Sequence, residues 1–268
     1  MIGLSSCVRC AAVSLLRNGV NSRIDLSSSF QSRCLSLASL DPQEKENLLQ
    51  PTLFKGFLYR LATSDDRDQI RDGLERWFYP GDPVGSEHRD GPQYVEEDMD
   101  WMLGLIEHGI VIVAHEKSSG SFAGFCGAQL IGPDYVPEMI ELAKTAETRK
   151  FRDICLFLAH CTRNANIFER YQIETAYQTP YTSVDPKFRG RKLGSVMMDQ
   201  NLEIAKILGA GAIYGDCTGP YMARSCQRIG MRCVYEIAYR DYRDENGEIV
   251  FKTKPGYEYL QCHAMKLT

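Results

Sequence analysis

The sequence predicts an α/β protein of the α+β kind, in which helices pack on a central mixed sheet within a single domain. Three observations predict this fold. Some segments alternate apolar and polar residues as strands do, others repeat apolar residues every three or four positions as helices do, and the two kinds are mixed along the chain. Residues 50–268 form the domain, because no internal repeat or low-complexity tract divides them.

The first part of the domain combines one strand with two helices. Residues 56–62 alternate apolar and polar side chains and predict the first strand. Residues 63–78 predict a helix that is capped by Thr63 or Ser64. A loop with three prolines and three glycines then separates this helix from a second one over residues 93–109.

The remainder of the chain continues to alternate strands and helices. The predicted strands are 110–116, 122–132, 173–184, 212–217 and 257–268, and the predicted helices are 135–168 in two pieces, 192–211 and 219–230. Residues 232–253 predict a hairpin whose turn is Asn246-Gly247, since this dipeptide between apolar runs is a strong short-range hairpin signal.

Composition argues against several kinds of partner. The formal net charge is −4, so an anion must be bound by a local site, and neither nucleic acid nor an anionic membrane is expected. No apolar run approaches 18 residues, which argues against a transmembrane span. Of the ten cysteines only Cys7 and Cys10 have CxxC spacing, so we expect reduced, packed thiols and no metal site. We also expect a monomer.

Residues 1–40 differ from the rest in composition. They are rich in serine and hold four arginines against a single acid, Asp25. An arginine-rich, serine-rich and acid-poor start is typical of a mitochondrial presequence, and "RCLS" at 33–36 resembles a matrix-processing site. We therefore expect a mitochondrial targeting peptide. The alternative is a disordered tail on a cytoplasmic protein.

An unusual group of residues stands where the strand ending at Val184 passes into the next helix. It comprises two glycines and three cations: Arg189, Gly190, Arg191, Lys192 and Gly194. Glycine lets a ligand approach the main chain closely, and the first N–H groups of a helix lack partners and carry partial positive charge. This combination predicts a pyrophosphate site, although a basic solvated loop is the alternative.

The same residues, "VDPKFRGRKLG", resemble the acetyl-CoA signature [Q/R]-x-x-G-x-[G/A] of the GNAT N-acetyltransferases. Arg189 takes the first position and Gly194 the last, whereas Lys192 replaces the middle glycine. The family uses that position through its backbone N–H, so lysine is compatible with the role if its backbone is helical. The resemblance implies acetyl-CoA as co-substrate and a mostly antiparallel sheet of about seven strands. It also implies that this sheet splays between its fourth and fifth strands, with helices on both faces.

A second segment narrows the resemblance. Residues 215–267 are similar to the insect and nematode arylalkylamine (dopamine-type) N-acetyltransferases, and a weaker similarity extends back to about residue 57. This implies direct, sequential transfer of an acetyl group to the primary amine of a small molecule, either arylalkylamine-like or a polyamine. Two alternatives remain open, namely an inactive acyl-CoA-binding module and an N-acetyltransferase that acts on proteins.

The resemblance also implies catalytic roles. Asp82 in "GDPV" takes the place of the family's proton-accepting glutamate, with Glu87 and His88 as fallbacks. Thr218 matches the first of two hydroxyl residues, whereas Met222 replaces the second. The remaining catalytic candidate is Tyr221, which matches a family tyrosine that either lines the CoA channel or protonates the leaving thiolate.

The implied acetyl-CoA contacts surround the same strand end and helix start. They are Ser183, Val184, Arg189, Gly190, Arg191, Lys192, Leu193, Gly194, Tyr221 and Arg224. Among them the Val184 N–H is expected to donate to the thioester oxygen. We expect Trp77, Phe78 and Cys226 to be core residues, although the two aromatic residues can also wall an amine pocket.

Overall fold

The computed structural model describes residues 50–107 and 110–267, so the predicted targeting segment 1–40 lies outside the described residues. These residues form one eight-stranded sheet in the order β1-β2-β3-β4-β5-β6-β8-β7. The strands are β1 Thr52–Phe54, β2 Phe57–Leu61, β3 Val111–Glu116, β4 Phe122–Ile131, β5 Ala176–Val184, β6 Ala212–Cys217, β7 Arg232–Ala238 and β8 Tyr259–Lys266. Every neighbouring pair is antiparallel except β5 and β6, which confirms the predicted mixed and mostly antiparallel sheet. The sheet has one strand more than expected, because the short β1 pairs with β2.

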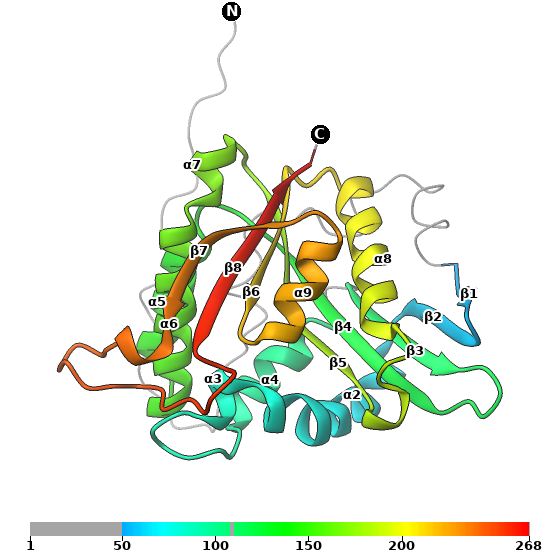
Figure 1. Cartoon of the computed structure of the whole chain (residues 1–268), viewed down its shortest axis with the longest axis horizontal. Coiled ribbons are helices and arrows are strands. Elements are labelled where there is room, and N and C mark those ends of the chain that lie inside the picture. Colours follow the sequence, from blue (N-terminus) through cyan, green and yellow to red (C-terminus); the bar gives the residue numbers. More distant parts are fainter. Residues whose placement is uncertain (1–49, 108–109, 268) are drawn as a thin grey trace, which may run out of the picture. The chain divides into compact units, whose positions relative to one another are not determined.

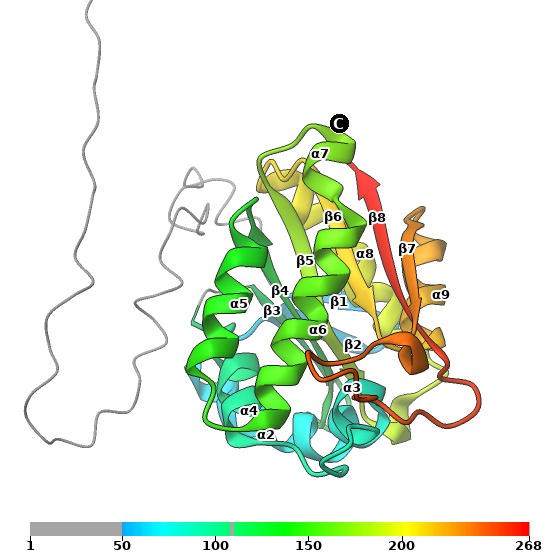
Figure 2. The same ribbon diagram turned by 90° about the vertical axis from the view of Figure 1, so that its left-hand side faces the viewer.

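Helices cover both faces of the sheet, as predicted (Figures 1 and 2). The α-helices are α2 Arg67–Gly73, α3 Pro83–Ser86, α4 Glu96–Gly104, α5 Tyr135–Thr145, α6 Arg149–Ala165, α7 Ile167–Tyr171, α8 Leu193–Ile207 and α9 Pro220–Arg228. In the two views α5 and α6 lie side by side on one face of the sheet, and α8 and α9 lie on the other. No helix of the described ranges is long and apolar enough to cross a membrane.

The predicted helix over residues 63–78 is not uniform. It begins with a 3₁₀ turn at Ser64–Asp66, continues as α2 and ends in a π-helical turn at Leu74–Phe78. A further 3₁₀ turn at Tyr79–Gly81 and the short α3 follow in the stretch predicted to be a loop. This change of helical period places Asp82 at the N-cap of α3, and π-helical turns are frequent at functional sites.

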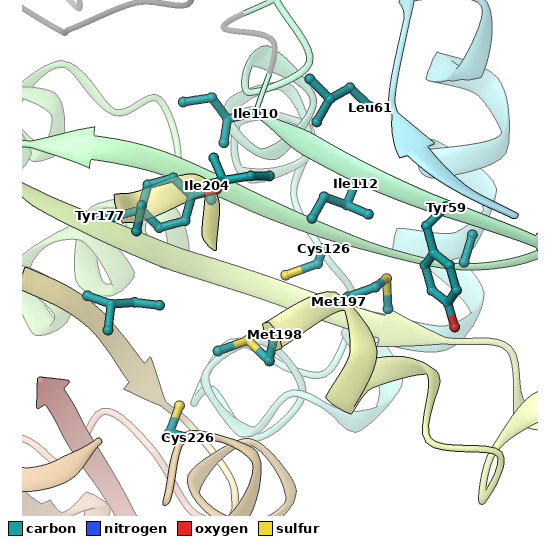
Figure 3. Packing of buried hydrophobic residues seen from close by; sticks show 14 of the residues in the cluster. Tyr59, Leu61, Ile110, Ile112, Cys126, Tyr177, Met197, Met198, Ile204 and Cys226 are labelled. Carbon is teal, nitrogen blue, oxygen red and sulfur yellow. The ribbon is translucent and has the colours of Figure 1, made fainter. Parts of the chain in front are cut away.

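The main hydrophobic core lies between the sheet and α8 (Figure 3). Met197, Met198 and Ile204 of α8 pack in one cluster with Cys126 of β4 and Tyr177 of β5. The hydroxyl of Tyr177 donates to Asn201 Oδ1 of the same helix at 2.6 Å. The cysteines of the described part are free thiols, and all of them except Cys233 are buried. This core fixes the position of α8 relative to the end of β5.

The predicted hairpin over residues 232–253 is wrong in its pairing. The turn at Asn246-Gly247 does form, and Gly247 has φ +79°, but its arms share only the bridge between Arg243 and Ile249. β7 pairs with β8 instead. Phe251 is buried against Phe157, with ring centroids 4.7 Å apart, so burial of this aromatic side chain outweighs local hairpin formation.

The sheet splits between β5 and β6. These are the fourth and fifth strands of the expected sheet, because the short β1 adds one strand at its edge, so the split lies where the resemblance implied. Only Ala176–Gln178 pairs with β6, although β5 continues to Val184. The pairing of β5 with β4 is also irregular just beyond Gln178, where a bulge lies beside Pro180. Because proline has no N–H to donate and a bulge bends its strand, these residues explain why the two strands separate at this point.

Candidate functional site

The split leaves one edge of β5 free of a partner strand. Asp185 donates its N–H to Ala123 O, on the β4 side, at 3.0 Å. Successive N–H groups of an extended strand point to opposite edges, so the N–H of Val184 points away from β4 and toward the split. The carbonyl of Val184 faces the same edge and accepts from Arg189 Nε at 3.2 Å. The backbone N–H and C=O groups of β5 therefore line one side of the split between β5 and β6.

The N-terminus of α8 lies at the end of the same strand segment. Gly190 has φ +78°, in the left-handed region that glycine tolerates best. The residue before the helix, Lys192, makes no side-chain hydrogen bond to the helix. The first N–H groups of a helix have no acceptor within it, so this terminus presents unpaired donors and the positive end of the helix dipole.

Lys192 has a left-handed backbone, with φ +69° and ψ +18°, and is not helical as the compatibility argument required. For a residue with a Cβ atom this conformation costs roughly 1–2 kcal/mol. The middle position of the signature therefore demands a left-handed residue, which explains why glycine is the family's choice. Lysine adopts the same turn at the cost of local strain.

The three cations of the signature do not share one role. Arg191 is held by an ion pair with Glu116, at 2.8 Å, and its guanidinium lies 4.4 Å from the ring centroid of Phe57. It therefore anchors the loop to β2 and β3. The side chains of Arg189 and Lys192 are exposed beside the helix terminus. Ser183 and Leu193 are buried, so their side chains support the loop from within.

Gly194 leaves open space beside the first turn of α8. A Cβ atom built at this position would meet only Thr182 Cγ2 and Val184 Cγ2, both at the ordinary contact distance of 3.9 Å. The packing of the chain therefore does not require glycine here. The bare backbone at this position fits the close approach of a ligand.

A cavity opens on the other face of the sheet, where β5 and β6 part. Its empty volume, including the mouth, is about 600 Å³. Gln178 and Pro180 of β5 line it, together with Asp216 of β6 and Thr218 just beyond that strand. The remaining walls are mostly apolar side chains of α4, α5 and α6, and Phe78 also contributes. Phe78 thus belongs to the cavity wall, whereas Trp77 stacks on Phe122, with ring centroids 5.8 Å apart.

Asp82 and Thr218, two of the residues to which the resemblance assigned catalytic roles, both line this cavity. Asp82 is only 8 % exposed. Its Oδ2 accepts from the Gly85 N–H at 2.9 Å, and its Oδ1 has no hydrogen-bond partner among the described residues. Burial raises the pKa of Asp82, and the nearby Thr218 hydroxyl acts in the opposite direction. A buried carboxylate with one unpaired oxygen is suited to accept a proton.

Two further buried carboxylates line the cavity, and the sequence analysis missed both. Burial raises the pKa of Asp98 to about 7, and the negative charge of Asp82 contributes to this rise. Asp98 had the appearance of an ordinary acid in the first turn of a helix. Asp216 is a charged residue within the otherwise uncharged strand "AIYGDC", and such a residue in a buried strand indicates a candidate site.

The other predicted residues lie away from the cavity. Tyr221 of α9 is 70 % exposed, and the guanidinium of Arg224 lies over its ring at 4.8 Å. Glu87 pairs with Lys254 at 3.1 Å, and His88 is buried against Asp153 at 3.3 Å. The two fallback residues are therefore engaged in holding the loop in place. Cys226 is fully buried in the core, as expected.

Solved structures of several acetyltransferases share this architecture. A mosquito arylalkylamine N-acetyltransferase-like 5b protein is 32 % identical, with a TM-score of 0.76 over 79 % of this chain and 100 % of its own. A Drosophila melanogaster polyamine N-acetyltransferase, an enzyme that forms N-acetylagmatine, is 24 % identical with a TM-score of 0.74, over 79 % of this chain and 100 % of its own. Arylalkylamine N-acetyltransferase 2 from Aedes aegypti is 22 % identical with a TM-score of 0.73, over 80 % and 100 %.

No protein-family model matches the chain. The mosquito protein carries an argument beyond the fold, because its identity exceeds 30 % and the similarity spans its whole length. The split sheet, the uncapped start of α8 and the cavity beside the split agree with that relationship. The chain therefore belongs to the GNAT superfamily of N-acetyltransferases, alongside the arylalkylamine N-acetyltransferases of insects.

Proposed function

We propose that the protein transfers the acetyl group of acetyl-CoA directly to the primary amine of a small molecule, arylalkylamine-like or polyamine, while both substrates are bound. One observation carries this proposal. The split between β5 and β6 has an unpaired helix terminus at one end and a cavity with buried carboxylates at its side. The two substrates thus have separate sites that meet at the split.

Acetyl-CoA fits the first of these sites. The donors at the start of α8 and the open space beside Gly194 suit a pyrophosphate, and Arg189 and Lys192 add positive charge. The free edge of β5 suits the amide groups of the pantetheine arm, which would bind as an added strand. Tyr221 and Arg224 on α9 are proposed as further contacts of CoA. Acetyl-CoA supplies the activated acetyl group as a thioester.

Asp82 is the proposed proton acceptor for the amine. An alkylammonium has a pKa of about 10 and cannot attack a carbonyl carbon until it loses a proton. The unpaired Oδ1 of Asp82 can take this proton inside the cavity. The negative charge of Asp82 also raises the pKa of Asp98, so the ionisation of Asp98 depends on the state of Asp82.

The Val184 N–H is the proposed donor to the oxygen of the thioester carbonyl. As the amine nitrogen forms its bond to the carbonyl carbon, negative charge grows on that oxygen. The carbon–sulfur bond then breaks, and the sulfur of CoA takes up a proton while the nitrogen of the new amide loses one. We propose Tyr221 as the donor to the sulfur, and the proton released by the nitrogen restores its hydroxyl.

The shape of the cavity favours a small acceptor over a protein. Its lining residues are largely buried and mostly apolar, as in the pockets that bind small molecules. The relatives also support small amines, since they are named as arylalkylamine and polyamine acetyltransferases.

An assay of thiol release from acetyl-CoA tests the proposal. We expect release with at least one of dopamine, tyramine, serotonin and spermidine. Tight CoA binding in calorimetry without release for any amine would instead identify a binding module. If the protein does not bind CoA at all, both functions are excluded.

A further inference from the structure

Asp216 is a buried carboxylate whose hydrogen bonds all come from neutral groups. Its Oδ1 accepts from the Tyr214 hydroxyl and from Cys262 Sγ, the latter at 3.2 Å, and its Oδ2 accepts from Gln178 Nε2 at 3.1 Å. Within residues 50–107 and 110–267 no lysine, arginine or histidine forms an ion pair with it. Its hydrogen-bonding capacity is thus largely used, and burial raises its pKa, so a cation bound beside it would favour the ionised carboxylate.

The three carboxylates of the cavity, Asp82, Asp98 and Asp216, differ in the cations near them. None of the lining residues is a lysine or an arginine. The nearby Lys150 donates its Nζ protons to the carbonyls of Gly91 and Gln93, at 2.8 and 2.6 Å, and its positive charge lowers the pKa of Asp82 and of Asp98. No cation of the described residues acts on Asp216 in this way. Asp216 is therefore the carboxylate whose ionised form a ligand cation would stabilise most.

The hydroxyl of Tyr135 is a second, independent sign of an incomplete site. This residue of α5 is 2 % exposed and lines the cavity, and its hydroxyl has no hydrogen-bond partner among the described residues. The hydroxyl lies near Asp216 and near Gln178, the residue whose amide donates to Asp216. Buried polar groups are rarely left without partners in folded proteins, so this oxygen is placed to accept from a bound ligand.

We infer that Asp216 and Tyr135 form a subsite for a second cationic nitrogen of the acceptor, so that the preferred substrates are diamines. Asp216 and Thr218 are two residues apart on the same face of β6 and its extension, a separation of about 7 Å. Because Thr218 lies beside Asp82, the second nitrogen would sit at roughly this distance from the reacting one. The terminal nitrogens of an extended four- or five-carbon diamine are about 6–8 Å apart, from standard bond lengths.

A phenolic hydroxyl is a poorer fit to this subsite than a cation. Asp216 already accepts three hydrogen bonds from neutral donors, so another neutral donor would add little. A second ammonium would bring the full positive charge that no neutral donor supplies, and it would meet the one carboxylate of the cavity that no cation of the described residues offsets. The apolar walls of α4, α5 and α6 would contact the carbon chain between the two nitrogens.

The inference rests on the proposed function and is tested by matched substrates. We would measure kcat/KM for butylamine against 1,4-diaminobutane and for pentylamine against 1,5-diaminopentane. We expect the wild type to prefer the diamines by about 10- to 100-fold, the value of one charged hydrogen bond of about 1.5–3 kcal/mol. In Asp216→Asn, which keeps the size of the side chain, the ratio should fall to near one. In Tyr135→Phe it should fall less.

Controls separate this inference from the proposed function. Asp134→Asn removes the same charge from an exposed residue next to Tyr135 and should leave the substrate ratio unchanged. Calorimetric CoA binding shows that each variant is folded. Equal rates for amines and diamines, an unchanged ratio in Asp216→Asn, or a preference for tyramine over both diamines would overturn the diamine subsite only. If CoA binds but no amine of any kind is acetylated, the proposed function itself fails.

Discussion

Asp82→Asn should lower kcat/KM for the acceptor amine by about 100- to 10,000-fold, the usual contribution of a general base. The amide keeps the size of the side chain and can still accept from the Gly85 N–H through its oxygen. It can no longer take a proton from the ammonium at Oδ1. Steady-state thiol release measures the loss, and calorimetry should show unchanged affinity for CoA.

The pH dependence of the same variant gives an independent test. Burial raises the pKa of Asp82 and raises that of Asp98 to about 7, and each carboxylate can accept a proton only when ionised. The kcat/KM of the wild type should therefore rise with pH as the two carboxylates ionise, which for Asp98 happens at about pH 7. In Asp82→Asn the neighbouring negative charge is lost, so the pKa of Asp98 falls and the acid limb of any remaining activity should move to lower pH. An unchanged rate and profile would exclude Asp82 as the base.

Val184→Pro should lower kcat by about 100- to 1,000-fold, which is the usual effect of removing one donor to a developing oxyanion. Proline lacks the N–H group. The substitution removes no hydrogen bond of the β4–β5 ladder, because this N–H points toward the split. The fold should therefore survive, and a thermal unfolding scan would verify this.

Val184→Ala is the matched control for the backbone argument. It shortens the side chain, which is half-buried against the main core, but keeps the N–H group. We expect some loss of stability and a kcat within a few-fold of the wild type. If the alanine variant is as impaired as the proline variant, the side chain matters and the backbone assignment is wrong.

Much of the fold was predictable because local periodicity and tertiary packing agree over most of the chain. The apolar stripe of α8 and the alternating burial in the second half of β5 follow from burial on one face, and the nearly continuous apolar run of β4 follows from burial on two. The segment after β7 was predicted incorrectly because Phe251 packs against the ring of Phe157, which is distant in the sequence, and does not pair with β7 in a local hairpin. Sequence patterns report local preferences, and this pairing depends on a contact with α6.

The candidate site was predictable only in part, for a similar reason. The Arg189–Gly194 loop is contiguous, so its chemistry is visible in the sequence. The acids of the cavity come from three separate elements, and only the fold shows that Asp98 and Asp216 share a space with Asp82. The left-handed turn at Lys192 was also hidden, because a lysine in that conformation has no local sequence signal.

Backbone hydrogen exchange of the full chain with and without CoA tests the central claim most directly. The claim is that unpaired amides at the start of α8 and on the free edge of β5 hold the two ends of the CoA chain. CoA should therefore slow exchange in residues 190–195 and 182–184. Adenosine 3′,5′-bisphosphate should protect only the first segment, and pantetheine only the second. If CoA binds but leaves exchange in both segments unchanged, the account is contradicted.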